Sequence, residues 1–154
     1  MVEKYRYLDK LTLEQIVLEH RILIVNDEES IREMLRINLV MRGYDVAVSP
    51  GNEGVHDLVK DFNPDVVITD IVLNVIDGFE LCRKICSETN SSVIGINMRG
   101  IDSDMLECIE IGVSEFLNLP AGVDEILARV KAVLRSRRLL KNGKTFKYRE
   151  WSAI

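Results

Sequence analysis

The sequence contains no apolar run near the roughly 20 residues that a membrane-spanning helix requires. Its start, Met1-Val-Glu-Lys-Tyr-Arg-Tyr, is too polar and too acidic for a secretory signal. Internal repeats and low-complexity stretches are also missing. These absences argue against a membrane, secreted or repeat protein, and they predict a cytoplasmic globular domain.

Cysteine is scarce as well. The chain has three cysteines, an odd number, and none lies at a metal-ligand spacing with either of the two histidines. This pattern provides neither a disulfide framework nor a zinc site. Cys82 and Cys86 lie four residues apart in a helical pattern, so we expect them to pack as small apolar residues in a reducing compartment.

Basic residues are few in most of the chain. Nine of the 20 Lys and Arg residues lie in residues 129–154, together with one of the 25 acidic residues, Glu150. An acidic body with a basic end is typical of a solvated tail, or of a linker or docking segment. Nucleic-acid binding by the tail alone has little support, because its only stacking side chains are Phe146, Tyr148 and Trp151.

The chain does contain a regular alternation of apolar strands and amphipathic helices. Arg21-Ile-Leu-Ile-Val25 is the short continuous apolar run that a strand buried on both faces needs. A helix that ends at Gly43 follows it, with apolar residues at helical spacing at Ile31, Met34, Leu35 and Leu39. The alternation continues with strands at 45–48, 64–69, 93–96 and 114–117, and with helices near 51–61, 79–88, 102–111 and 123–140.

Five successive βα units predict an α/β fold, with a doubly wound, five-stranded parallel sheet and helices on both faces. We place this domain at residues 21–138, between an N-terminal extension (1–20) and a basic C-terminal tail or linker (139–154). The extension is predicted to form a short extra helix. Thr12 and Gln15 have the spacing of a capping box, and Leu13, Ile16 and Val17 would share one apolar face.

Ligands of such a sheet bind beyond the carboxyl ends of the strands, near the point where the strand order reverses. The residues at these ends are Asn26 and Asp27, Asp70, Asn97 and Leu119. Carboxylates that meet there suit Mg²⁺, which binds through one or two carboxylates and keeps several waters. Asp27 and Glu28 also precede a helix, where acids are favoured in any case. Asp70 ends an apolar strand, so we expect it to be functional.

Four segments carry a family resemblance through their order and spacing. They are Ile22-Leu-Ile-Val-Asn-Asp-Glu-Glu29, Pro64-Asp-Val-Val-Ile-Thr-Asp-Ile71, Asp77-Gly-Phe-Glu-Leu81 and Gly112-Val-Ser-Glu-Phe-Leu-Asn-Leu-Pro120. Together they resemble the bacterial response-regulator receiver domain (CheY-like), over residues 21–138. The resemblance implies strand order 2-1-3-4-5. The helix at 125–135 further resembles receivers that precede winged-helix DNA-binding domains.

The resemblance also implies roles for individual residues. By position, Asp70 matches the aspartate that takes a phosphoryl group from a histidine kinase in that family. Asp27, next to Glu28, matches a direct ligand of Mg²⁺, and Asp70 and the backbone carbonyl of Val72 would be further ligands. Phe116 matches the aromatic residue that moves on phosphorylation, although a plain packed aromatic is an equal interpretation.

The departures from the family pattern decide what this site does. Asn26 replaces a second acid, Asn97 replaces a hydroxyl that grips the phosphoryl group, and Met98 replaces a small residue that leaves it room. Leu119 replaces a lysine that pairs with the phosphoryl oxygens, and Asn74 replaces a loop proline. Phosphoryl transfer depends on positioning and on cations aimed at the transferred oxygens. We therefore expect weak Mg²⁺ binding and weak or absent phosphorylation of Asp70.

The first hypothesis for function is an atypical receiver that acts by binding a protein, either a histidine kinase or an output protein. The surface formed by residues 102–111, strand 114–117 and the last helix would serve, with a homodimer as one arrangement. Glu115 and Arg129 match charges that pair across this surface in the winged-helix subgroup, but the helix at 102–111 has no basic residue to complete the network.

The alternative is a conventional Mg²⁺-dependent switch at Asp70, as the receiver part of a transcriptional regulator. We do not expect an enzyme. An aspartate-nucleophile phosphatase needs a second acid two residues after the nucleophile, and position 72 is valine. Direct nucleic-acid binding would require either a further domain or a dimer that presents the basic tail, because too few residues follow the last helix for a winged helix.

Overall fold

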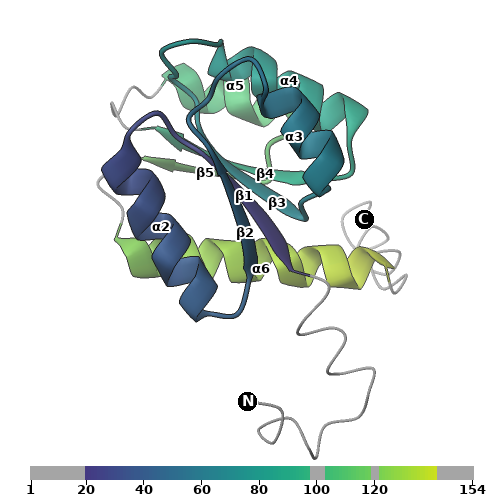
Figure 1. Cartoon of the computed structure of the whole chain (residues 1–154). Coiled ribbons are helices and arrows are strands. Elements are labelled where there is room, and N and C mark those ends of the chain that lie inside the picture. The colour runs from purple at the N-terminus through teal and green to yellow at the C-terminus, as the bar shows by residue number, and fades with distance from the viewer. Residues whose placement is uncertain (1–19, 98–102, 119–121, 142–154) are drawn as a thin grey trace, which may run out of the picture.

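The computed structural model describes residues 20–97, 103–118 and 122–141 (Figure 1). These ranges contain alternating strands and helices, labelled as in Figure 1: β1 (Arg21–Val25), α2 (Glu29–Met41), β2 (Asp45–Ser49), α3 (Val55–Phe62), β3 (Val66–Asp70), α4 (Gly78–Glu88), β4 (Ser92–Asn97), α5 (Ser103–Ile111), β5 (Glu115–Asn118) and α6 (Val123–Lys141).

The five strands form one parallel sheet in the order β2-β1-β3-β4-β5. The predicted fold class and strand order are therefore confirmed. The chain passes from β1 outward to β2 and then returns to β3 on the other side of β1, so the strand order reverses between β1 and β3. In a doubly wound sheet this reversal opens a crevice at the carboxyl ends of those two strands.

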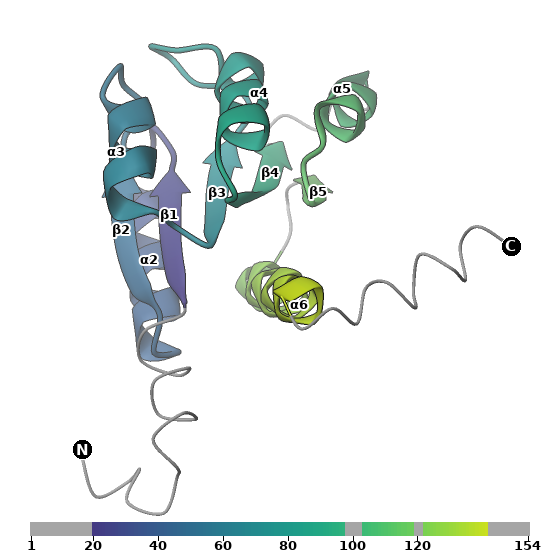
Figure 2. The same cartoon turned by 90° about the vertical axis from the view of Figure 1, so that its right-hand side faces the viewer.

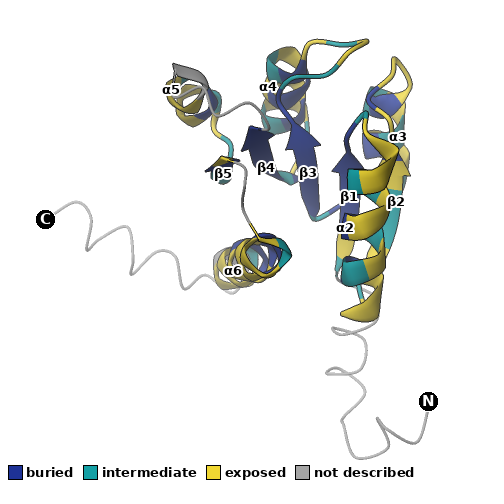
Figure 3. Cartoon of the chain, turned by 90° about the vertical axis from the view of Figure 1, so that its left-hand side faces the viewer, coloured by how far each residue is buried: buried dark blue, intermediate teal, exposed yellow. Residues whose placement is uncertain are grey.

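Helices cover both faces of the sheet (Figures 1 and 2). Along β1, Ile22 and Ile24 pack on the α2 and α6 side, while Leu23 and Val25 pack on the side of α3 and α4. This alternation follows from the strand geometry, because successive side chains point to opposite faces. Every residue of β3 is buried, and Figure 3 shows the same burial at the centre of the sheet. A strand covered on both faces needs the continuous apolar runs that the sequence has.

Two details of the predicted helices are wrong. The helix placed at 51–61 begins later, at Val55, because Gly51 has a positive φ of 83° that no helical residue adopts. In α2, Leu35 and Leu39 are buried as predicted, but Met34 is 39% exposed and faces away from the core. Gly43 ends α2 as expected, with a φ of 92° and an amide that donates to Val40 O at 2.9 Å.

The cysteines pack as the sequence predicts. Cys82 and Cys108 are buried, Cys86 is half-buried, and none of the three forms a disulfide. Burial raises the pKa of Cys82 to about 12, so this thiol stays neutral at ordinary pH and behaves as a small apolar group.

The ends of the chain are only partly described. The predicted N-terminal helix lies outside the described residues, as does most of the basic tail. Helix α6 ends at Lys141, close to the predicted end of this helix near residue 140 and three residues beyond the expected end of the domain at residue 138. Within the described ranges, no helix is both long enough and apolar enough to cross a bilayer.

Candidate functional site

The strand register brings the predicted site residues to one edge of the sheet. Val25 pairs with Thr69, so the residues after β1 lie beside Asp70, the last residue of β3. Asp70 itself pairs with Ile96, which places Asn97 next to it at the end of β4. This edge includes the point where the strand order reverses, which is where doubly wound sheets bind their ligands. Of the predicted set, Met98 and Leu119 lie outside the described residues.

Asp70 is a buried acid, with only 4% of its surface exposed. Its Oδ1 accepts the backbone N–H of Val72 at 3.1 Å, and its backbone carbonyl accepts the Thr69 hydroxyl at 2.9 Å. The carboxylate is thus fixed by the strand that carries it and by the loop that follows. A buried carboxylate requires such partners, because burial of an ionised group without hydrogen bonds costs several kcal/mol of stability.

Asp27 connects two loops. Its Oδ2 accepts the backbone N–H of Asn74 at 3.0 Å, which joins the β1–α2 loop to the β3–α4 loop. Glu28 is the N-cap residue of α2, where an acid is favoured, but its side chain makes no capping hydrogen bond. Sequence reasoning missed the contact with Asn74, and no side-chain pattern could have revealed it, since the donor is a backbone amide.

Asn26 is buried, with 1% of its surface exposed. Its Oδ1 accepts the backbone N–H of Glu28 at 2.8 Å, and its backbone carbonyl accepts a hydrogen bond from Arg32 at 2.7 Å. The amide oxygen therefore closes a local turn before α2. Arg32 was also missed from the sequence, where it is one of several basic residues on a surface helix.

Asn97 is fully buried, and its Nδ2 donates to Asn118 Oδ1 at 3.1 Å. This bond joins the carboxyl ends of β4 and β5. The half-buried Phe116 on β5 pairs with Gly95 rather than with Asn97, and a Cβ built at Gly95 would lie 3.5 Å from its ring. Asn97 is thus part of a contact between two strands.

The motif Asp77-Gly78 determines how α4 begins. Asp77 Oδ1 accepts the backbone N–H groups of Phe79 at 2.9 Å and Glu80 at 3.3 Å, as an N-cap does. A Cβ on Gly78 would lie 2.2 Å from the carbonyl oxygen of Ile71, so only glycine fits. This packing holds α4 against the residue that follows Asp70.

The oxygen ligands available at this edge are of the kind that Mg²⁺ prefers, but they are few. Asp27, Asp70 and the carbonyl of Val72 would hold the ion, which takes one or two carboxylates and several waters. Among the described residues, no cluster of three or more His, Cys, Asp or Glu side chains could bind a metal. Mg²⁺ at this edge would offset the charge of the carboxylates and of an incoming phosphoryl group.

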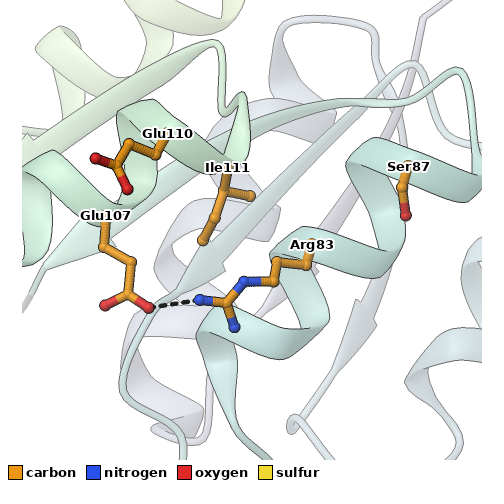
Figure 4. A pocket seen from close by; sticks show the side chains of 5 residues that line it. All are labelled: Arg83, Ser87, Glu107, Glu110 and Ile111. Atoms are coloured by element: carbon orange, nitrogen blue, oxygen red, sulfur yellow. Dashed lines mark hydrogen bonds and ion pairs between the residues drawn. The ribbon is translucent and has the colours of Figure 1, made fainter.

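A separate hollow of about 520 Å³ lies between α4 and α5 (Figure 4). The ion pair between Arg83 and Glu107, at 2.7 Å, spans it, and Ser87 lies farther along α4. The hollow is lined from the middle and end of α4, whereas the edge that holds Asp70 faces the start of that helix. It is therefore not part of the candidate site.

Comparisons with known proteins agree with this geometry. A family model described as the response regulator receiver domain matches residues 22–131. A putative response regulator from Chloroflexus aurantiacus is 28% identical, with a TM-score of 0.70, and the match covers 75% of this chain and 98% of that one.

Two other solved structures resemble the fold. The BeF₃-activated N-terminal receiver domain of Klebsiella pneumoniae RstA has a TM-score of 0.71 and 24% identity, covering 75% of this chain and 99% of that one. The signal receiver domain of a putative LuxO repressor protein from Vibrio parahaemolyticus has a TM-score of 0.75 and 22% identity, covering 80% and 96%.

Proposed function

Because the chain belongs to the response regulator receiver domain family of two-component signalling, we propose that it is an atypical receiver. Receiver domains are signalling modules rather than typical enzymes, and they interact with histidine kinases or output domains. In this proposal the chain signals by binding a protein, and phosphorylation of Asp70 is weak or absent.

The observation that carries this proposal is the use of two amides at positions where the family places reactive groups. Asn26 Oδ1 is engaged by the Glu28 N–H at 2.8 Å, and Asn97 Nδ2 is engaged by Asn118 at 3.1 Å. Both amides therefore bond to the protein itself. Leucine at position 119 and methionine at position 98 support the same conclusion, since neither side chain offers a charge or a hydrogen-bond donor to a phosphoryl group.

A conventional Mg²⁺-dependent switch is the second candidate, favoured by the two acids that the site keeps. Asp70 is buried at the strand end and Asp27 stands beside it at the same edge. In this candidate, Asp27, Asp70 and the carbonyl of Val72 bind Mg²⁺ and Phe116 reports the phosphorylated state.

Incubation with Mg²⁺ and acetyl phosphate, followed by intact-mass measurement, separates these candidates. We expect the wild-type chain to gain a phosphoryl group on only a small fraction of molecules, because the site lacks the cation that would stabilise the transferred oxygens. The Asp70→Asn variant controls for labelling elsewhere. A near-complete adduct in the wild type that disappears in Asp70→Asn would reject the atypical receiver and support the switch.

The surface formed by α5, β5 and α6 is the proposed protein-binding surface. Helix α5 exposes three large apolar side chains: Met105 is 45% exposed, Ile109 58% and Leu106 68%. Adjacent apolar groups of this kind are typical of an interaction site. The nearby pair Arg129 and Glu115 lies 3.6 Å apart within one chain, so these charges would have to exchange partners to pair across a homodimer.

Substitution of Leu106 tests this surface. We expect Leu106→Glu to abolish concentration-dependent self-association, measured by sedimentation velocity, because it places a charge in the apolar contact. Met41→Glu is the matched control, since Met41 is 81% exposed on α2, on the opposite face of the sheet. Equal self-association of wild type and Leu106→Glu would exclude the homodimer on this surface.

Membership of the receiver domain family also supports proposals on the domain boundaries, the location and the ligands of this protein. Residues 21–138 form the receiver domain, with residues 1–20 and 139–154 as extensions, and the protein is cytoplasmic. Nucleic acid becomes a ligand only if a further domain is attached, as in receivers of winged-helix regulators.

A further inference from the structure

A second hollow, of about 310 Å³, lies at the opposite edge of the sheet from Asp70. One side of it is formed by His20, which precedes β1, and by residues 42–44, which lead from α2 into β2. Helix α6 forms the other side. We call this hollow the α2–α6 cleft. The proposals about Asp70 do not involve it.

The α2–α6 cleft has an unusual concentration of positive charge. Four of its lining residues are cationic: Arg42 from the end of α2, and Lys131, Arg135 and Arg138 from successive turns of α6. The described residues that line it include no acid. Arg42, Lys131 and Arg135 form no ion pair with any residue that the structure describes.

Helix dipoles account for only part of this cluster. A cation near a helix C-terminus is stabilising, and this explains Arg42 at the end of α2. The effect falls off within the last turn, whereas α6 ends at Lys141 and Lys131 lies near its middle. Like charges gathered in one hollow repel one another, so the cluster favours the binding of an anion.

Two aromatic side chains with polar atoms and an apolar side chain complete the cleft. Nδ1 of His20 is buried without a hydrogen-bond partner among the described residues, and the His20 ring meets Tyr44 edge-on at 5.8 Å. Burial raises the pKa of Tyr44, against the opposing effect of Arg42, so the phenol stays protonated and can donate. Leu134 adds buried apolar surface.

We propose that the α2–α6 cleft binds a small phosphorylated molecule with a planar ring, of the nucleotide class. Arginine guanidinium groups match phosphate oxygens in geometry, and half-buried Tyr44 offers an aromatic surface to a ring. The volume lies at the lower end of the range for small-molecule pockets, about 300–1,000 Å³. A long nucleic acid would need a charged stripe, whereas these groups converge on one hollow.

Calorimetric titration of the full chain with ADP and with inorganic pyrophosphate, at about 0.15 M salt, tests the proposal. We expect ADP to bind and pyrophosphate to bind about tenfold more weakly, because it lacks the ring. Lys131→Ala and Arg135→Ala should each weaken ADP binding about tenfold, since each removes one charge-assisted contact. Lys84→Ala, on α4, is the matched surface control, and Asp70→Asn should also leave binding unchanged.

Several outcomes would overturn the proposal. Absence of ADP binding would exclude the site. If Lys84→Ala weakened ADP binding as much as Lys131→Ala or Arg135→Ala, the binding would be non-specific electrostatic attraction. If pyrophosphate bound as tightly as ADP, the ring would contribute nothing to binding, and the ligand would be a phosphate compound without a required ring. A short DNA duplex that binds more tightly than ADP, and that loses affinity in the same variants, would assign the cleft to nucleic acid instead.

Discussion

A variant that carries Asn26→Asp, Asn97→Thr, Met98→Ala and Leu119→Lys will accept phosphate from acetyl phosphate at least about 100-fold faster than the wild type. The substitutions restore the second acid, the hydroxyl, the space and the cation that family receivers have. Asp70 needs no change, because it is already buried at the end of β3 with Oδ1 fixed by the Val72 N–H. The initial rate of phosphoryl uptake, followed by intact mass, provides the measurement.

Controls identify which restored group acts. Leu119→Lys alone should supply most of the gain, since it provides the cation, whereas Leu119→Ala should supply none. Asp70→Asn in the restored variant should remove the uptake entirely. If the restored variant is no faster than the wild type, the four departures are not the reason for weak phosphorylation, and the cause must lie elsewhere in the site.

Gly78→Ala is expected to lower the free energy of unfolding by about 3 kcal/mol. The new methyl group would lie 2.2 Å from Ile71 O and 2.8 Å from Ile71 Cα. These atoms belong to backbone that follows Asp70, so they cannot rotate away as the end of a side chain would. Either α4 or the β3–α4 loop must shift. Urea unfolding, followed by far-UV circular dichroism, measures the loss.

Gly122→Ala is the matched control. Apart from its chain neighbours, no atom of the described residues lies within 4 Å of a Cβ built at Gly122, and its φ is outside the left-handed region, so stability should change by less than about 0.5 kcal/mol. A Gly78→Ala variant as stable as Gly122→Ala would mean that the loop after Asp70 yields easily. The tight contact between α4 and Ile71 would then have no role in fixing the site.

The sequence predicts the sheet well, because a parallel strand buried on both faces needs an uninterrupted apolar run and little else. Segment 21–25 is such a run, and its bounds are correct. Helix boundaries are less well determined by composition. Residues 51–54 contain no strong helix breaker besides glycine, and only the backbone angle at Gly51 explains why α3 starts at Val55.

The sequence was enough to place the candidate site residues at one edge of the sheet, but it could not predict their hydrogen bonds. An acid that ends an apolar strand, as Asp70 does, is visible in the sequence because burial of a charge is costly. The bond between Asp27 and the Asn74 amide depends instead on the path of a loop. The bond between Asn97 and Asn118 likewise depends on the register of β4 with β5.

The bond between Asn97 and Asn118 has a consequence for how information would pass through this protein. Neither amide ionises or accepts a phosphoryl group, so the hydrogen bond between the ends of β4 and β5 contains no group that pH or a kinase changes directly. In the proposed atypical receiver, the adjacent binding surface then has one form. Partner occupancy follows mass action, and the cell would set the output through the amount of this protein that it makes.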